Sequence, residues 1–265
     1  ENFPIFIMGD LNASSSAKSV SMLTKDTENR VSRWASSEGL ADYVFAAVDQ
    51  NGTTTDTSRW MTYDATAFGG QGGVRATPSN GATGAQWLLG SSAQKHRTVF
   101  LVFQWTATTY FSHVFGHATA DCGLRGGVSP AYKFPVEDNG IYELNGEMVA
   151  TTNAINYSQH HGETQVLVFE TTEANADSTT KFNCIPGIGS YWISSLGNND
   201  RCMNGVYGEV IAYDRVLTAD ERAQVTAMLN FKWRTDVNYW VGGATGDWNT
   251  PANWSKGSVP TVAEM

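Results

Sequence analysis

The chain has 265 residues, with 26 acidic and 17 basic side chains and a formal net charge of −9. Charged residues make up 16% of the chain, against roughly 25% in typical domains, and aromatic residues make up 12%. This composition supplies a large core and excludes general disorder. The sequence has no basic stripe for nucleic acid and no apolar run near the ~20 residues of a membrane span. We therefore expect neither nucleic-acid binding nor membrane insertion.

Most of the chain is predicted to be β-strand. Short runs rich in β-branched and aromatic residues, bounded by turn residues, cover 4–8, 43–48, 97–105, 164–171 and 207–214. The run at 97–105 is almost entirely apolar, which favours a strand covered on both faces. At 141–150 the dipeptide Asn145–Gly146 predicts a hairpin with a type I′ turn. Many short strands and few helices predict a β-sandwich or jelly roll.

A single amphipathic helix is predicted near the C-terminal end, from Thr218 to Trp233. Thr218 and Glu221 have the spacing of a capping box. Apolar side chains with near-helical spacing are expected to form its buried face: Val225, Met228, Leu229 and Trp233. Residues 236–265 change to Gly, Pro and Trp with few aliphatic side chains, so we place a domain boundary near 235.

The segment 203–233 resembles the C-terminal signature of laminin-G-like, concanavalin A-like jelly rolls of bacterial surface proteins. In that signature a Gly-x-x-x-Glu strand leads to Tyr-Asp-Arg and then to a capped helix ending in Lys-Trp. The matching residues include Gly205, Glu209, Tyr213, Asp214, Arg215, Leu217, Thr218, Glu221, Lys232 and Trp233. The resemblance implies an all-β, concanavalin A-like β-sandwich over 1–235 with one C-terminal helix.

The remaining segment, 236–265, is similar to the opening of repeats that follow such jelly rolls in secreted bacterial proteins. We expect a linker and the start of a following β repeat module. The opening ENFPIFIMGD has neither the basic segment nor the cleavage site of a signal peptide, which is typical of a mature piece of a longer protein. The resemblance implies an extracellular or cell-surface location, with other modules of the same chain as partners.

Fold alone does not give function, because this sandwich serves lectins, glycosidases, adhesins and spacers alike. Retaining glucanases of the fold carry two acids on one face of a strand. Glu209 and Asp214 come nearest, but an offset of five places them on opposite faces, so we interpret both as structural. Glu143 and Glu147, beside the hairpin turn, are interpreted as solvated acids. His113 and His117 would meet on a helix, as in zinc sites, but their segment is also typical of a strand.

These observations favour a non-catalytic recognition or adhesion module that binds glycans. Two alternatives stay open: a glycoside hydrolase with its acids on separate strands, and a passive spacer. A glycan site needs an apolar platform with a few converging polar groups. The candidate ligand-binding residues are Trp60, Trp87, Gln104, Trp105, Tyr110 and Trp192. Each tryptophan has the alternative of a place in the core.

The resemblance to laminin-G-like domains implies calcium as a candidate cofactor. Asn198, Asn199 and Asp200 offer closely spaced oxygen ligands, although the same residue types also favour turns. The chain has three cysteines, so at least one has no partner within the chain. Two alternatives stay open for Cys184 and Cys202: a disulfide between them, or free thiols.

Overall fold

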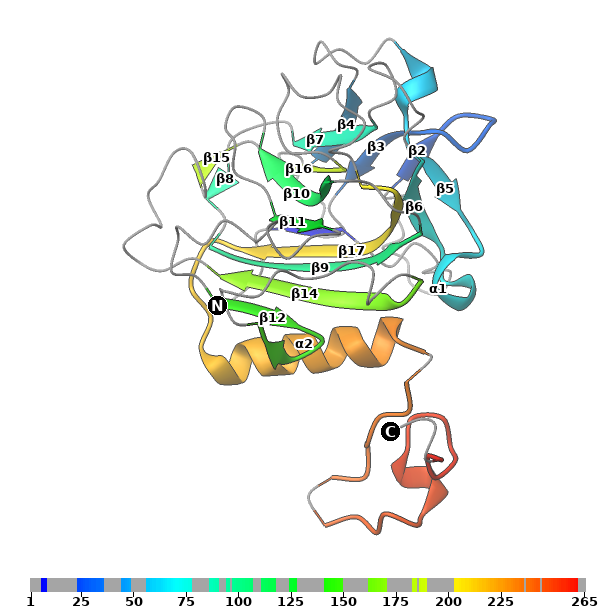
Figure 1. Cartoon of the computed structure of the whole chain (residues 1–265), viewed down its shortest axis with the longest axis vertical. Coiled ribbons are helices and arrows are strands. Elements are labelled where there is room, and N and C mark those ends of the chain that lie inside the picture. Colours follow the sequence, from blue (N-terminus) through cyan, green and yellow to red (C-terminus); the bar gives the residue numbers. More distant parts are fainter. Residues whose placement is uncertain are drawn as a thin grey trace.

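Two antiparallel sheets and one long helix make up the part of the chain that the computed structural model describes (Figure 1). The described residues are 6–8, 23–35, 44–48, 56–77, 86–90, 94–95, 97–106, 111–117, 124–127, 141–149, 162–170, 183–184, 186–189, 203–235, 237–243 and 245–261. The predicted strands are present, so the prediction of a β-sandwich is confirmed at this level.

The first sheet has eight strands, and β9 and β17 lie at its centre. Its order is β13 (Glu147–Met148), β12 (Ile141–Leu144), β14 (Thr164–Glu170), β9 (Thr98–Trp105), β17 (Gly205–Tyr213), β6 (Gly73–Ala76) and β5 (Thr62–Asp64), and β1 (Phe6–Met8) also pairs with β17.

The second sheet has seven strands. Their order is β11 (Leu124–Gly127), β10 (Phe111–His117), β16 (Pro186–Ile188), β7 (Trp87–Gly90), β4 (Val44–Val48), β3 (Val31–Ala35) and β2 (Leu23–Lys25). A separate pair is formed by β15 (Asn183–Cys184) and β8 (Gln94–Lys95).

Strand β9 is covered on both faces, as its apolar sequence predicts. Side chains alternate along a strand, so Leu101 and Phe103 point into the core between the two sheets. Phe100 and Val102 point the other way, into a second core beneath the helix. We call these two clusters the inter-sheet core and the helix-side core. The first sheet is therefore the middle layer of the molecule.

The hairpin of β12 and β13 turns at Asn145 and Gly146, as predicted. Their φ angles are 57° and 97°, the positive values that a type I′ turn requires. The Asn145 side chain also holds the neighbouring strand: its Oδ1 accepts from the Val166 amide at 2.8 Å, and its Nδ2 donates to Gln165 Oε1 at 2.8 Å.

Helix α2 (Ala219–Trp233) begins at the predicted capping box. The Thr218 hydroxyl accepts from the Glu221 amide, and the Glu221 carboxylate accepts from the Thr218 amide at 2.8 Å. The predicted buried face is wrong in one respect, because Met228 is 50% exposed. The residues that α2 buries are Arg222, Thr226, Leu229, Asn230 and Trp233. Three of these five residues are polar, and two of them find partners beneath the helix: Arg222 in Glu143 and Glu170, and Asn230 in the Asn145 carbonyl.

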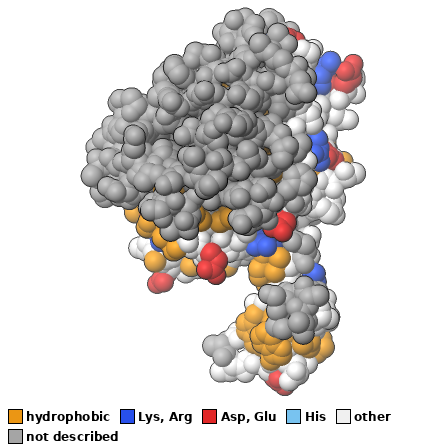
Figure 2. All heavy atoms as spheres, viewed as in Figure 1, with side chains coloured by type: hydrophobic (Ala, Val, Ile, Leu, Met, Phe, Trp, Pro, Cys, Tyr) orange, Lys and Arg blue, Asp and Glu red, His pale blue; other side chains and the backbone are white. Residues whose placement is uncertain are grey.

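Residues 237–261 lie apart from the sheets, below α2 in Figure 1. Hydrogen bonds close this segment on itself, among them Ser255 N to the Tyr239 carbonyl at 2.8 Å. Trp254 is buried against Trp240 and Trp248, with ring centroids 5.1 and 4.3 Å away. Figure 2 shows hydrophobic side chains gathered on this segment. The domain boundary near 235 stays a prediction. Among the described residues, no helix is long and apolar enough to cross a bilayer.

Candidate functional site

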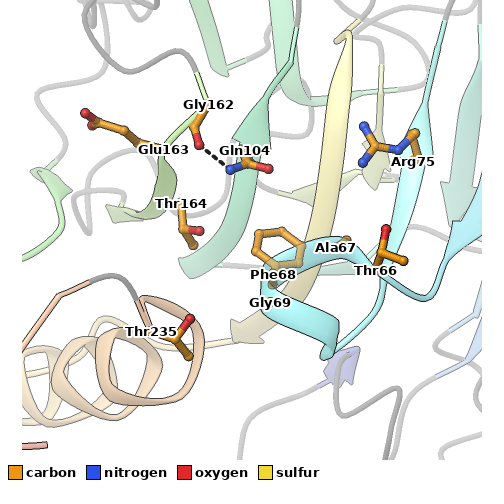
Figure 3. Close-up of a pocket in the computed structure, with 10 residues that line it drawn as sticks. All are labelled: Thr66, Ala67, Phe68, Gly69, Arg75, Gln104, Gly162, Glu163, Thr164 and Thr235. Carbon is orange, nitrogen blue, oxygen red and sulfur yellow. Dashed lines mark hydrogen bonds between the residues drawn. The ribbon is translucent and has the colours of Figure 1, made fainter. Parts of the chain in front are cut away.

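Of the residues predicted to bind a ligand, Gln104 lines a pocket. Alternation along β9 places it on the same face as Phe100 and Val102, the face that α2 covers. Gln104 lies near the end of the strand, where its side chain is partly exposed. Its Nε2 donates to the Gly162 carbonyl, and its oxygen is turned toward Arg75 (Figure 3).

The pocket has a volume of about 360 Å³. This lies within the range of about 300–1,000 Å³ in which small-molecule pockets fall. It is lined by Thr66, Ala67, Phe68, Gly69, Arg75, Gln104, Gly162, Glu163, Thr164 and Thr235. The lining thus has three hydroxyls, an amide and a guanidinium beside one aromatic ring, Phe68, which is 6% exposed, and a carboxylate at the rim. These groups both donate and accept hydrogen bonds, so they suit a ligand rich in hydroxyl groups.

The aromatic ring comes from a strained turn. Phe68, in the short helix α1 (Ala67–Gly70), has φ 52° and ψ 44°, a left-handed conformation that is rare for a bulky residue. Such strain costs on the order of 1–3 kcal/mol and persists only where surrounding structure imposes it. Here the Phe68 ring packs edge-on against Trp233 at 5.1 Å, and Gln71 Nε2 donates to the Lys232 carbonyl at 2.6 Å. The end of α2 therefore holds one wall of the pocket.

Arg75 enters the pocket already paired with Asp64. The guanidinium donates to Asp64 Oδ2 from Nε at 2.8 Å and from Nη2 at 2.5 Å. Thr66 donates to Asp64 Oδ1 from its amide at 2.9 Å and from its hydroxyl at 2.7 Å. The Thr66 hydrogen bond and the Arg75 ion pair lower the pKa of Asp64 from 3.8 to about 2. Asp64 is therefore ionised at neutral pH and offsets the charge of Arg75.

The other described candidates do not join this pocket. Trp87 and Trp105 are 0% and 1% exposed, so both are buried, as the alternative interpretation of each tryptophan has it. Trp105 belongs to the inter-sheet core, whereas the Trp87 ring lies against Gly187 of β16. Trp105 shares the inward face of β9 with Phe103, whose ring it meets edge-on at 4.7 Å. Trp60 is half-buried and packs on the inter-sheet core. For a sugar to stack on Trp87 or on Trp105, that ring would have to leave the interior.

Several predictions fall outside the described residues. These are the ligand-binding roles of Tyr110 and Trp192, the calcium ligands Asn198, Asn199 and Asp200, and the Cys184 bridge to Cys202. His113 and His117 lie on β10, which confirms the strand interpretation and places them about 13 Å apart along it. Within the described part of the chain, no three His, Cys, Asp or Glu side chains gather as a metal site.

Glu209 is structural, as the sequence predicts. It is 3% exposed, and its Oε2 accepts from Trp233 Nε1 at 2.5 Å and from Lys232 Nζ at 3.0 Å. A register shift between Tyr207 and Glu209 in the pairing of β17 with β9 accompanies this contact with α2. Asp214 lies after the end of β17 and is exposed.

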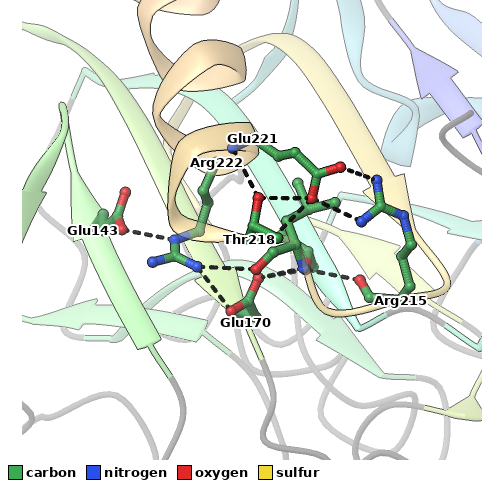
Figure 4. Close-up of polar contacts among 8 residues, drawn as sticks. Glu143, Glu170, Arg215, Thr218, Glu221 and Arg222 are labelled. Carbon is green, nitrogen blue, oxygen red and sulfur yellow. Dashed lines mark hydrogen bonds and ion pairs between the residues drawn. The ribbon is translucent and has the colours of Figure 1, made fainter. Parts of the chain in front are cut away.

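A second polar cluster lies at the start of α2 (Figure 4). Arg222 Nε donates to Glu143 Oε1 at 2.8 Å, and its Nη1 donates to Glu170 Oε1 at 3.0 Å. Glu170 Oε2 also accepts from the Thr98 hydroxyl at 2.8 Å. The interpretation of Glu143 as a solvated acid is wrong, because it is 8% exposed beneath the helix. These two acids hold a guanidinium in the interior and face no described pocket.

Sequence reasoning missed most of the pocket. Thr66, Arg75, Thr164 and Thr235 lie on four separate segments, and none belongs to a recognisable motif. Only the position of Gln104, beside turn residues at the end of a strand, signalled the site. Comparison of the chain with protein-family models, with curated proteins and with solved structures gave no match.

Proposed function

We propose that this protein is a concanavalin A-like jelly-roll module of an extracellular bacterial protein, and that it recognises glycans at the pocket around Gln104. The observation that carries the proposal is the convergence of the Gln104 amide with the hydroxyls of Thr66 and Thr164 beside the Phe68 ring. Sugars present hydroxyls at their rims and C–H groups on their faces, so they match such a lining.

The tertiary arrangement supports a preformed site. Thr164 begins β14 and Gln104 lies on the adjacent strand β9, directly opposite in register. Phe68 is held against Trp233, so the apolar wall does not have to form on binding. A preformed pocket spends less of its binding free energy on ordering side chains.

Affinity gel electrophoresis on a panel of neutral plant and microbial polysaccharides tests the proposal. We expect at least one polysaccharide to retard the wild type. Gln104→Leu should weaken that binding at least about tenfold, since a buried ligand hydroxyl loses its partner. Gln224→Leu, the same change on the exposed side of α2, is the matched control and should bind as the wild type does.

A folded wild-type sample that no polysaccharide retards would favour the passive-spacer alternative. If Gln104→Leu bound the polysaccharide as tightly as the wild type does, the binding site would lie elsewhere on the protein. The hydrolase alternative stays a prediction, with Glu163 as the carboxylate among the described lining residues. Release of new reducing ends from a bound polysaccharide would support it.

A further inference from the structure

The positive charge that lines the pocket is already compensated before any ligand enters. Arg75 is the cation among the described residues that line it. Its Nε–Nη2 edge, one of the two edges with which a guanidinium can grip a carboxylate through two parallel hydrogen bonds, is bound to Asp64. The two side chains are 27% and 20% exposed, so solvent screens this pair only in part.

A second carboxylate lies at the rim. Glu163 is exposed, and its carboxylate points away from the centre of the pocket in Figure 3. Glu163 and Asp64 thus set two negative charges against the one positive charge of Arg75. An anionic ligand would lose water on entering and would find no uncompensated cation among the described lining residues in return.

A neutral sugar meets no such penalty. The hydroxyls of Thr66, Thr164 and Thr235 and the amide of Gln104 exchange hydrogen bonds with hydroxyl groups without any change in charge. The Asp64–Arg75 pair then acts as a fixed dipole beside the ligand.

We infer that the pocket selects neutral sugars over sugars that carry a carboxylate at C6, because Asp64 compensates the charge of Arg75 and occupies one of its two carboxylate-binding edges. This inference rests on the proposed function and names its ligand class. Specificity here comes from disfavouring the acidic sugar, because Arg75, which could pair with its carboxylate, is already paired with Asp64.

Titration calorimetry at pH 7 tests the inference with three pairs of hexasaccharides: β-1,4-linked mannose, galactose and glucose, each beside its C6-carboxylate form. We expect the wild type to bind at least one neutral hexamer about tenfold or more tightly than its acidic counterpart. Asp64→Asn should shift that ratio at least about tenfold toward the acidic hexamer, because it frees the charge of Arg75. The shift should shrink in 1 M salt.

The Asp64→Asn variant keeps a side-chain oxygen that can accept from Thr66, and a cooperative thermal unfolding transition shows that it is folded. Asp247→Asn, the same change in the exposed C-terminal segment, should leave the ratio unaltered. Tighter binding of any acidic hexamer than of its neutral form by the wild type overturns the inference, as does an unshifted ratio in Asp64→Asn. If none of the six binds to the wild type while a polysaccharide of the panel retards it, the inference fails and the proposed function stands. If no polysaccharide retards it either, both fail.

Discussion

Arg222 is the residue whose burial is least expected from its chemistry. It is 7% exposed and holds Glu143 and Glu170 on two neighbouring strands of the first sheet. Burying an ion pair gains little over apolar packing, but removing one partner leaves an uncompensated charge in the interior. Arg222 therefore sets where α2 sits along the sheet more than it adds to stability.

Replacement of Arg222 by Ala should lower the free energy of unfolding by about 3–5 kcal/mol, because two carboxylates are left buried without their cation. Urea denaturation measures the loss. Arg215→Ala is the control: Arg215 also makes an ion pair with α2, at 2.8 Å to Glu221, but both side chains are 31% exposed. The control should lose far less. Equal losses for the two variants would contradict the structural role given to Arg222.

At the scale of elements, polar contacts fix α2 at both ends, in addition to the apolar contacts of Val225, Leu229 and Trp233 with the helix-side core. The capping box and Arg222 hold its first turn, and Trp233 with Asn230 holds its last turns, where Asn230 Nδ2 donates to the Asn145 carbonyl at 3.2 Å. Since Trp233 also supports Phe68, any change that frees the end of α2 should reach the pocket.

The first turn of α2 should make stability depend on pH. Hydrogen bonds from Arg215 and Thr218 lower the pKa of Glu221 from 4.5 to about 2. A depressed pKa in the folded state means that the contribution is fully present above about pH 4.5 and is lost as the pH falls toward 2. Thermal unfolding between pH 6 and pH 2 should therefore show a smaller acid-induced drop for Glu221→Gln than for the wild type. Parallel curves for the two proteins would refute this.

At the scale of the molecule, the sandwich and the C-terminal segment differ in how they are stabilised. The sandwich rests on two apolar cores on either side of the first sheet. The segment 237–261 rests on three tryptophans in mutual contact and on short-range hydrogen bonds such as Val241 N to the Asn253 carbonyl at 2.8 Å.

A chain that ends after residue 236 should consequently fold with a melting temperature within about 3 °C of the full chain, equivalent to about 1 kcal/mol. Differential scanning calorimetry measures the difference. A chain that ends after Leu229 serves as the control, because it lacks Asn230 and Trp233 and should melt far earlier. Loss of folding in the chain that ends after residue 236 would place the domain boundary beyond 235.

The elements that the sequence predicted correctly are those in which the decisive interactions are local. Asn145 and Gly146 alone provide the two positive φ values of the hairpin, and Thr218 with Glu221 closes a capping box within four residues. The apolar run of β9 indicated a strand in the middle of the molecule, because such a strand has no face left for water.

Those features were determined by the sequence itself, because turn, cap and strand preferences act between neighbours. The tertiary structure decided the rest. β9 is apolar on both faces, so only the packing of the two layers shows that Trp105 points inward and Gln104 outward. The pocket likewise joins Thr66, Gln104 and Thr235, which are far apart along the chain. Contacts between distant segments depend on how sheets and helix pack, and no local preference encodes them.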